Sequence, residues 1–378
     1  MNAEEPIREE ATGAADESVG LAERLRRIHR RAQQDMPALA RIAVALYDPD
    51  TDALKTFAHS RDGNDPLDRY EARLAEVPSL QSLADTGGMR RVGDMHTFGT
   101  DSTHSTVLRQ DYRSSITWPF YRGMRLAGFL FMNATEPNYF STDTVRRLEF
   151  VRELLVLMVL NTLKTVETIN ATVTVAKEVS HYRDEETGSH IDRVAHYARF
   201  IARERAGAEG LSDEFVEMLH MFSPLHDLGK VAVPDSVLLK PGRLTAEEFE
   251  IMKGHTTRGS DMVQRILRTA GMDLARHGQL LFNVVRHHHE SFAGGGYPDG
   301  LWGRLIPLEA RIVAVADVFD ALTSRRPYKE PWPVEKALDL LREERGQKFD
   351  PDCVDAFLSV LDEVLAVKER FKDDATFD

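Results

Sequence analysis

The spacing of hydrophobic and polar residues changes along the chain and divides it into two halves. Residues 41–60 hold two extended apolar runs on either side of an Asp-Pro-Asp turn, which predicts a hairpin. Residues 114–134, "SSITWPFYRGMRLAGFLFMNA", are rich in aromatic and β-branched residues and predict two more strands around the Arg122-Gly123 turn. Strands followed by flanking helices predict an α+β domain with one main sheet.

A helical period begins after Ser141, a good N-cap residue, and continues to about residue 182. The connecting helix therefore spans residues 143–182 in this interpretation. Its apolar residues alternate three and four apart, the spacing of a coiled-coil seam, at Leu148, Val151, Leu155 and Met158. Either the helix packs on its own domain, or it forms a parallel dimer that joins the two halves. We favour the homodimer.

The second half is almost entirely helical in pattern. A capping box at Thr245 and Glu248 predicts a helix start, and "PLEARIVAVADVFDALTS" predicts a buried helix. The expected organisation is an N-terminal tail at 1–20, an α+β domain at 21–142, the connecting helix at 143–182 and an all-α domain at 183–378.

Composition and charge exclude several classes of protein. The formal net charge is −13, so binding to a nucleic-acid duplex is disfavoured. A single cysteine, Cys353, excludes a disulfide framework and a multi-cysteine zinc site and fits a reducing cytoplasm. The N-terminus has no apolar region of a signal peptide, and the run "LLVLMVL" at 154–160 is too short to span a membrane. We therefore expect a cytoplasmic protein with no membrane partner.

The candidate chemistry lies in five motifs of the second half: "RDEETGSH", "HDLGK", "MKGH", "HHHE" and "ADVFD". His226 and Asp227 are read as neighbours on a helix, and His255 as the end of a helical run. Ionisable groups in apolar helices are costly to bury unless they pair or bind metal. Each motif alone is a weak signal, but the combined set has more ligands than one metal can use. Nitrogen and oxygen ligands without thiolates suit iron or manganese better than a structural zinc.

In this order the motifs resemble the HD-GYP family of cyclic di-GMP phosphodiesterases, a branch of the HD hydrolases. The resemblance runs from about 166 to 357 and rests on "RDEETGSH", "HDLGKVAVPD", "MKGHTTRGSDMV", "HHHESFAGGGYPDGLWGRLIP", "ARIVAVADVFDALTSRRPYK" and "GQKFDP". The first half resembles a GAF sensor domain more loosely, through "SSITWPFYRGMRLAGFLFMN" and "NYFSTDTVRRLEFV". The predicted fold is an α+β GAF-like domain joined by a long helix to an all-α HD-GYP domain.

The resemblance implies a cluster of two or three divalent metal ions, with iron the leading candidate and manganese the second. Asp227 would bridge two ions, and Glu186 favours a trinuclear site. The implied metal ligands are Glu186, His190, His226, Asp227, His255, His288, His289 and Asp317.

The implied activity is hydrolysis of cyclic di-GMP to linear pGpG and then to GMP, regulated by the GAF-like domain. Asp227 and Lys230 would be the catalytic residues, with Lys230 taking up charge near the leaving oxygen. The implied substrate-binding residues are Asp184, Lys230, Gly296, Tyr297, Arg326 and Lys329. The glycine run before Tyr297 would let the backbone approach the ligand closely.

One position departs from the family pattern. The aspartate that usually precedes the glycines is Ala293 here, which predicts a looser loop. Two alternatives therefore stay open. One is a catalytically weak effector that binds cyclic di-GMP and acts through signalling partner proteins. The other is a hydrolase for another nucleotide, such as cyclic GMP-AMP or a guanosine polyphosphate.

Overall fold

The structure is a computed structural model that describes residues 20–61, 65, 67–97, 110–179, 188–269, 277–324 and 330–372. Contacts divide the chain into two compact units, 1–161 and 162–378. The division falls inside one long helix, whereas the sequence suggested a separate connecting segment at 143–182. The predicted tail at 1–20 lies outside the described residues except for Gly20.

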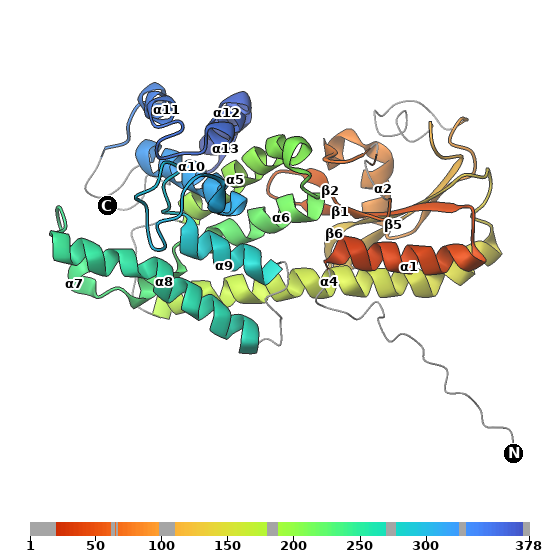
Figure 1. Cartoon of the computed structure of the whole chain (residues 1–378). Helices are drawn as coiled ribbons and strands as arrows, with labels where there is room; N and C mark the ends of the chain where they lie inside the picture. The colour runs from red at the N-terminus through yellow and green to blue at the C-terminus, as the bar shows by residue number, and fades with distance from the viewer. Residues whose placement is uncertain are drawn as a thin grey trace, which may run out of the picture. The chain divides into compact units, whose positions relative to one another are not determined.

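The first unit is built on one sheet (Figure 1). This sheet has six strands in the order β3-β2-β1-β6-β5-β4. The described elements of the unit are α1 (Leu21–Asp35), β1 (Leu39–Asp48), β2 (Ala53–His59), β3 (Glu71–Arg73), η1 (Leu74–Glu76), α2 (Pro78–Thr86), β4 (Arg90–Val92), β5 (Ser114–Arg122) and β6 (Arg125–Ala134). All neighbouring strands pair antiparallel. The prediction of an α+β domain with one main sheet is confirmed.

Both predicted hairpins are present. β5 and β6 pair from Ser114 opposite Ala134 to Arg122 opposite Arg125. Gly123 has a φ of 59°, a left-handed conformation that suits the first central position of a two-residue hairpin turn. β1 and β2 form the other hairpin, so the first half folds around local strand pairs.

The long helix α4 (Thr142–Val179) begins where the sequence predicts, because the Ser141 hydroxyl accepts a hydrogen bond from the Thr144 N–H at 3.2 Å. By length and composition alone, Thr142–Ala171 is the one described helix that meets the criteria for crossing a membrane. One such helix is weak evidence, and Leu148 and Leu155 within it are buried.

The predicted coiled-coil seam of α4 is not exposed in a way that would let a second copy of the chain pack on it. Leu148 and Leu155 are buried within the chain, while Val151 and Met158 are half-buried. Phe150 and Leu157 of the same helix are exposed instead, and Leu154 is half-buried. A seam spacing fixes which residues share a helix face, but it does not tell whether the chain itself or a second copy covers that face.

The second unit is helical, as predicted. Its described elements after α4 are α5 (Gly188–Glu209), α6 (Asp213–Phe222), η2 (Ser223–Leu225), η3 (Leu228–Ala232), α7 (Asp235–Leu238), α8 (Ala246–Thr269), α9 (His277–His287), η4 (Gly303–Leu305), α10 (Leu308–Thr323), α11 (Val334–Glu343), α12 (Pro351–Ser359) and α13 (Leu361–Arg370) (Figure 1). Tyr197, Phe319 and Phe357 pack ring against ring in its core, with centroids 4.8 to 6.3 Å apart. The capping box is confirmed, since Thr245 and Glu248 each accept the other's backbone N–H.

Two glycines let η3 approach α8 closely. A Cβ on Gly229 would lie 1.8 Å from the His255 carbonyl oxygen, and a Cβ on Gly259 would lie 2.9 Å from the Gly229 nitrogen. The absence of side chains at this crossing brings the segment that carries His226 and Asp227 against the helix that carries His255.

Candidate metal centre

Seven of the eight predicted metal ligands lie in the described part of the chain and come from five places in the helical unit. Glu186 lies outside the described residues, so its position is a prediction. The seven are His190 on α5, His226 and Asp227 between η2 and η3, His255 on α8, His288 and His289 at the end of α9, and Asp317 on α10. Five separate segments therefore converge on one centre.

Two local expectations about these ligands are wrong. His226 and Asp227 do not lie on an α-helix, because they occupy the junction of two short 3₁₀ helices. His255 does not end a helix but lies in the middle of α8. Pro224 at the start of η2 and the close approach at Gly229 explain why the chain turns here instead of continuing a regular helix.

The ligands form two groups, with Asp227 lying between them. One group holds Asp227, His255, His288 and His289, and the other holds His190, His226 and Asp317, each with ligand atoms within 4.8 Å of one another. Asp227 Oδ1 lies 3.2 Å from His255 Nε2 and 3.6 Å from His288 Nε2. Its Oδ2 lies 3.3 Å from His226 Nε2. One carboxylate thus presents a different oxygen to each group, as a bridging ligand does.

Four of the histidines are held in the same way. The Nδ1 atoms of His226, His255 and His288 lie 2.7 to 3.0 Å from the backbone carbonyls of Ser223, Met252 and Val284. His190 Nδ1 lies 2.8 Å from a carboxylate oxygen of Asp320. Carbonyls and carboxylates only accept, so each Nδ1 carries the proton, and the Nε2 lone pair is left for a metal.

The unsatisfied buried atoms at this centre suit a bound cation. Nε2 of His255, Nε2 of His288 and Oδ1 of Asp227 are buried and make no hydrogen bond to any described residue. Unsatisfied buried acceptors are costly, and divalent ions bound by nitrogen and oxygen would satisfy all three. The residues present therefore fit the predicted metal cofactor.

The charges at the centre favour the protonation states that metal ligands need. Burial lowers the pKa of His288, and burial lowers the pKa of His289 well below its usual range, so both imidazoles are neutral. Burial raises the pKa of Asp227, but the Lys230 ammonium and His226 outweigh this effect and hold that pKa well below its usual range. Lys230 Nζ lies 2.8 Å from Asp227 Oδ2, beside the predicted bridging carboxylate.

A second layer behind the ligands was not identified in the sequence. Asp320 is fully buried, and besides His190 Nδ1 it accepts two hydrogen bonds from Arg193, at 2.7 and 2.9 Å. The Arg193 guanidinium also donates to the Phe371 carbonyl, which ties α5 to the end of α13. Burial raises the pKa of Asp320, but hydrogen bonds from His190 and Arg193 outweigh it and lower the pKa to about 2. Asp320 lies three residues after Asp317 on the same helix, and this spacing was the signal in the sequence that could have identified it.

The glycine loop lies against the ligand pair. A Cβ on Gly296 would lie 2.3 Å from the Ser291 nitrogen, so only glycine fits this turn. The Tyr297 N–H donates to the His289 carbonyl at 3.3 Å, and the Tyr297 and His289 rings are 4.8 Å apart. Of the predicted substrate-binding residues, Lys230, Gly296 and Tyr297 therefore lie beside the centre.

The loop is anchored despite Ala293. The Ala293 N–H donates to the Gln347 carbonyl at 2.7 Å. Further along, Asp299 accepts both arms of the Arg286 guanidinium at 2.7 Å and lies 3.0 Å from His287 Nε2. The extra histidine of the "HHH" run thus fastens the loop to α9, and the prediction of a looser loop finds no support in these contacts.

The other predicted substrate-binding residues, Asp184, Arg326 and Lys329, lie outside the described residues, so their roles stay predictions.

Comparison with known proteins identifies the class of the helical half. Residues 176–353 match the family model described as HD domain, so this half of the chain is an HD domain. The prediction of that class is confirmed. The chain is 48% identical over 181 residues to the cyclic di-GMP phosphodiesterase response regulator RpfG of Xanthomonas campestris, covering 47% of this chain and 44% of that protein.

Two further relatives carry related names. A cyclic di-GMP phosphodiesterase of Thermotoga maritima is 46% identical over 198 residues, which is 52% of this chain and 51% of that protein. The 3′3′-cGAMP-specific phosphodiesterase 2 of Vibrio cholerae is 38% identical over 235 residues, which is 60% of this chain and 43% of that protein. The chain spans about half the length of the curated relatives it matches.

For the sheet unit, solved structures similar to part of the chain include a phycocyanobilin-bound GAF domain from a cyanobacterial phytochrome. It has a TM-score of 0.31 and 18% identity and covers 38% of this chain and 85% of that one. A GAF domain/HD domain protein from Geobacter sulfurreducens has a TM-score of 0.31 and 15% identity, covering 37% and 93%. The fold class of this unit rests on its own strand order, which is the α+β arrangement predicted.

Proposed function

We propose that this protein is a metal-dependent phosphodiesterase that hydrolyses a cyclic dinucleotide, with cyclic di-GMP as the first substrate to test. One observation carries the proposal: Asp227 presents one oxygen to each of two groups of inward-facing histidines. Such a carboxylate suits two metal ions held close together, the arrangement used to displace phosphodiester oxygens. The relatives are named as phosphodiesterases of cyclic di-GMP or of 3′3′-cGAMP, and these names support a cyclic dinucleotide as the substrate.

Metal ions bound here would supply Lewis acidity and lower the pKa of coordinated water. The chain supplies the rest. Four of its ligand histidines are each fixed in one tautomer. Lys230 brings a positive charge to 2.8 Å from Asp227 Oδ2, where it would stabilise charge that develops on the leaving oxygen. The proposal includes iron as the first metal, manganese as the second and a third ion held through Glu186. It also includes linear pGpG followed by GMP as products.

The test is turnover by the full chain, purified anaerobically and loaded with iron(II) or with manganese(II). Cyclic di-GMP, 3′3′-cGAMP and a linear dinucleotide are each supplied, and products are separated by chromatography. The proposal expects cyclic di-GMP to be opened to pGpG, and pGpG to be converted to GMP if three ions work together. Faster turnover of 3′3′-cGAMP than of cyclic di-GMP would make 3′3′-cGAMP the assigned substrate. Full metal content with no hydrolysis of any cyclic dinucleotide would leave the effector alternative.

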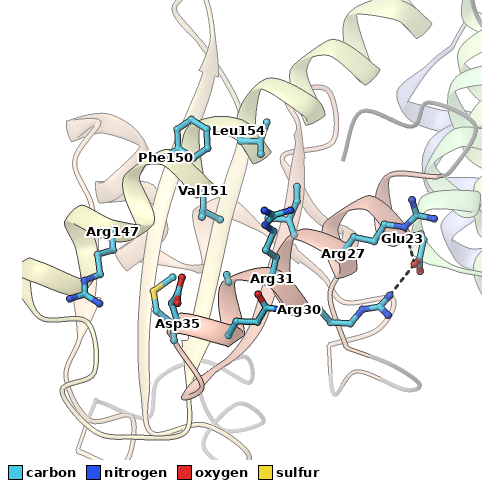
Figure 2. A pocket seen from close by; sticks show the side chains of 13 residues that line it. Glu23, Arg27, Arg30, Arg31, Asp35, Arg147, Phe150, Val151 and Leu154 are labelled. Atoms are coloured by element: carbon cyan, nitrogen blue, oxygen red, sulfur yellow. Dashed lines mark hydrogen bonds and ion pairs between the residues drawn. The ribbon is translucent and has the colours of Figure 1, made fainter. Parts of the chain in front are cut away.

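We also propose that the chain forms a homodimer through α4. A pocket in the first unit lies between α1 and α4 and has a volume of about 1320 Å³. Figure 2 shows that both apolar and arginine side chains line it. Phe150 and Leu154 line it from α4, and Phe150 is 75% exposed, as Leu157 is 65% exposed one heptad later. An outward apolar stripe with heptad spacing suits a second copy of the same helix.

Sedimentation of the Phe150→Asp variant tests this dimer. The matched control is Met124→Asp, because Met124 is 99% exposed at a hairpin turn in the same unit. The proposal expects wild type and Met124→Asp to sediment as dimers, and Phe150→Asp to dissociate at micromolar concentration. A dimer of unchanged strength in Phe150→Asp would contradict this interface.

A further inference from the structure

The rings at the metal centre continue outward into an aromatic wall. Tyr297 lies 4.8 Å from the His289 ring and 6.4 Å from the His255 ring, measured between centroids. The Phe249 ring of α8 lies 6.4 Å from the Tyr297 ring, edge to face at 82°. A row of three rings, those of His289, Tyr297 and Phe249, thus extends from the metal ligands towards solvent.

A cation lies over this wall. Lys253 is one helical turn beyond Phe249, and its ammonium lies 5.1 Å from the Phe249 centroid and 5.7 Å from the Tyr297 centroid. Glu250 holds the same ammonium at 2.6 Å. We call Phe249, Lys253 and Tyr297 the base wall.

Phe249 contributes little to the core, because 45% of its surface is exposed. A large apolar ring left in solvent beside a reaction centre suits a flat partner that can stack on it. Nucleobases stack on aromatic side chains with little regard to sequence, and each stacked base contributes measurably to affinity. Tyr297 of the base wall lies next to the rings of two predicted metal ligands, His255 and His289. A nucleotide whose base stacks on this wall would therefore have its phosphate close to the metal centre.

The ammonium adds a preference among bases. Guanine presents two adjacent acceptors, O6 and N7, whereas adenine presents one acceptor beside an amino donor. A lysine donor therefore suits guanine and opposes the amino group of adenine. We propose that Phe249 and Lys253, beside the predicted substrate-binding residue Tyr297, form a subsite for one guanine of the substrate, in which Phe249 supplies the stacking surface and Lys253 the preference for guanine. This subsite rests on the proposed function and adds which side chains choose the base.

The experiment uses the full metal-loaded chain and compares cyclic di-GMP with cyclic di-AMP, in which both bases are adenine. Phe249→Ala is expected to raise KM for cyclic di-GMP about tenfold, the size of one lost base stack, with kcat and metal content within twofold of wild type. Lys253→Met is expected to lose about fivefold or more of the preference for cyclic di-GMP over cyclic di-AMP, measured as the ratio of kcat/KM.

Matched controls come from the same region. Ile251→Ala removes another exposed apolar side chain of α8, which is 38% exposed and is not part of the base wall. Lys240→Met removes a lysine that pairs with Glu248 at the start of the same helix. Both controls are expected to keep the KM and the base preference of wild type.

Calorimetric binding of cyclic di-GMP separates failure of the subsite from failure of the proposed function. If wild type binds but does not hydrolyse, the proposed activity is wrong, and the affinity of Phe249→Ala still decides the subsite. Unchanged KM and affinity in both Phe249→Ala and Lys253→Met would overturn the subsite and leave the activity intact. Loss of metal or of kcat in Phe249→Ala would also overturn it, because the ring would then be supporting Tyr297 and the ligands. A wild type that neither binds nor hydrolyses cyclic di-GMP overturns both.

Discussion

Replacing Asp320 by asparagine removes one charge from the layer behind the metal ligands while keeping the volume of the side chain. The wild-type carboxylate is fully buried and contacts His190 Nδ1 at 2.8 Å and the Arg193 guanidinium at 2.7 and 2.9 Å. Asp320→Asn therefore removes the negative charge that the Arg193 guanidinium, itself 2% exposed, contacts at 2.7 and 2.9 Å. It also weakens the acceptor that fixes the tautomer of His190.

Two estimates of the effect agree in direction. The fall of the Asp320 pKa from 3.8 to about 2 corresponds to roughly 2 kcal/mol in favour of the ionised, folded state. Breaking a buried ion pair by removing one partner costs about 3–5 kcal/mol. We expect Asp320→Asn to lose about 2–5 kcal/mol of unfolding free energy. We also expect a loss of about 10–100-fold in metal affinity, which is the usual effect of removing a partner behind a histidine ligand.

Urea unfolding of the metal-free chain and metal titration monitored by calorimetry measure the two effects separately. The control is Asp339→Asn, whose carboxylate pairs with Arg342 on an exposed helix surface and should change stability by less than about 0.5 kcal/mol. If Asp320→Asn matched this control in both stability and metal affinity, Asp320 would not position His190 and the reasoning would be refuted.

Three other outcomes follow from the same contacts. Gly229→Ala should lower the unfolding free energy of the helical unit on the order of several kcal/mol, as overpacking a core does. The reason is that the new Cβ would lie 1.8 Å from the His255 carbonyl oxygen. In the neighbouring control Gly254→Ala, the nearest atoms are 3.7 Å away, and thermal melting should show a gain of up to about 1 kcal/mol. The folded pKa of Asp320 is below its unfolded value, so its stabilisation is present above about pH 4 and is lost as pH falls towards 2. The stability gap between wild type and Asp320→Asn should therefore close over that range, and a constant gap would be contrary evidence. Removal of metal by a chelator should lower the melting temperature of wild type, with about 3–4 kcal/mol lost from a site previously held at 100 to 1,000 times its Kd; an unchanged melting temperature would argue against a bound ion.

The metal ligands could be predicted from the sequence only as a set, because each motif alone is a weak signal and the resemblance to a known family identified which residues belong together. The predicted groups His190, His226 and Asp317, with Asp227 beside them, do converge in space. The sequence could not predict the path of the backbone at His226. The residues there are compatible with a regular α-helix as well as with the junction of two 3₁₀ helices that the structure has.

The supporting residues and the outward face of α4 were harder to predict. Asp320 lies on the same helix as a ligand, and only the folded packing shows that it turns to Arg193 and His190 instead of solvent. For α4, the heptad spacing of Leu148 and Leu155 was detected correctly, but these residues are buried within the chain and Phe150 faces outward. Periodicity identifies the faces of a helix, and tertiary contacts decide which neighbour each face meets.

The most direct test of the central claim compares wild type with Asp227→Asn for metal content and for hydrolysis of cyclic di-GMP in the same anaerobic preparation. If Asp227 bridges the two ligand groups, the variant loses at least one ion per chain, and turnover falls by several orders of magnitude together with it. Wild-type turnover by an Asp227→Asn variant that keeps its full metal content would contradict the bridging role and, with it, the proposed function of this centre.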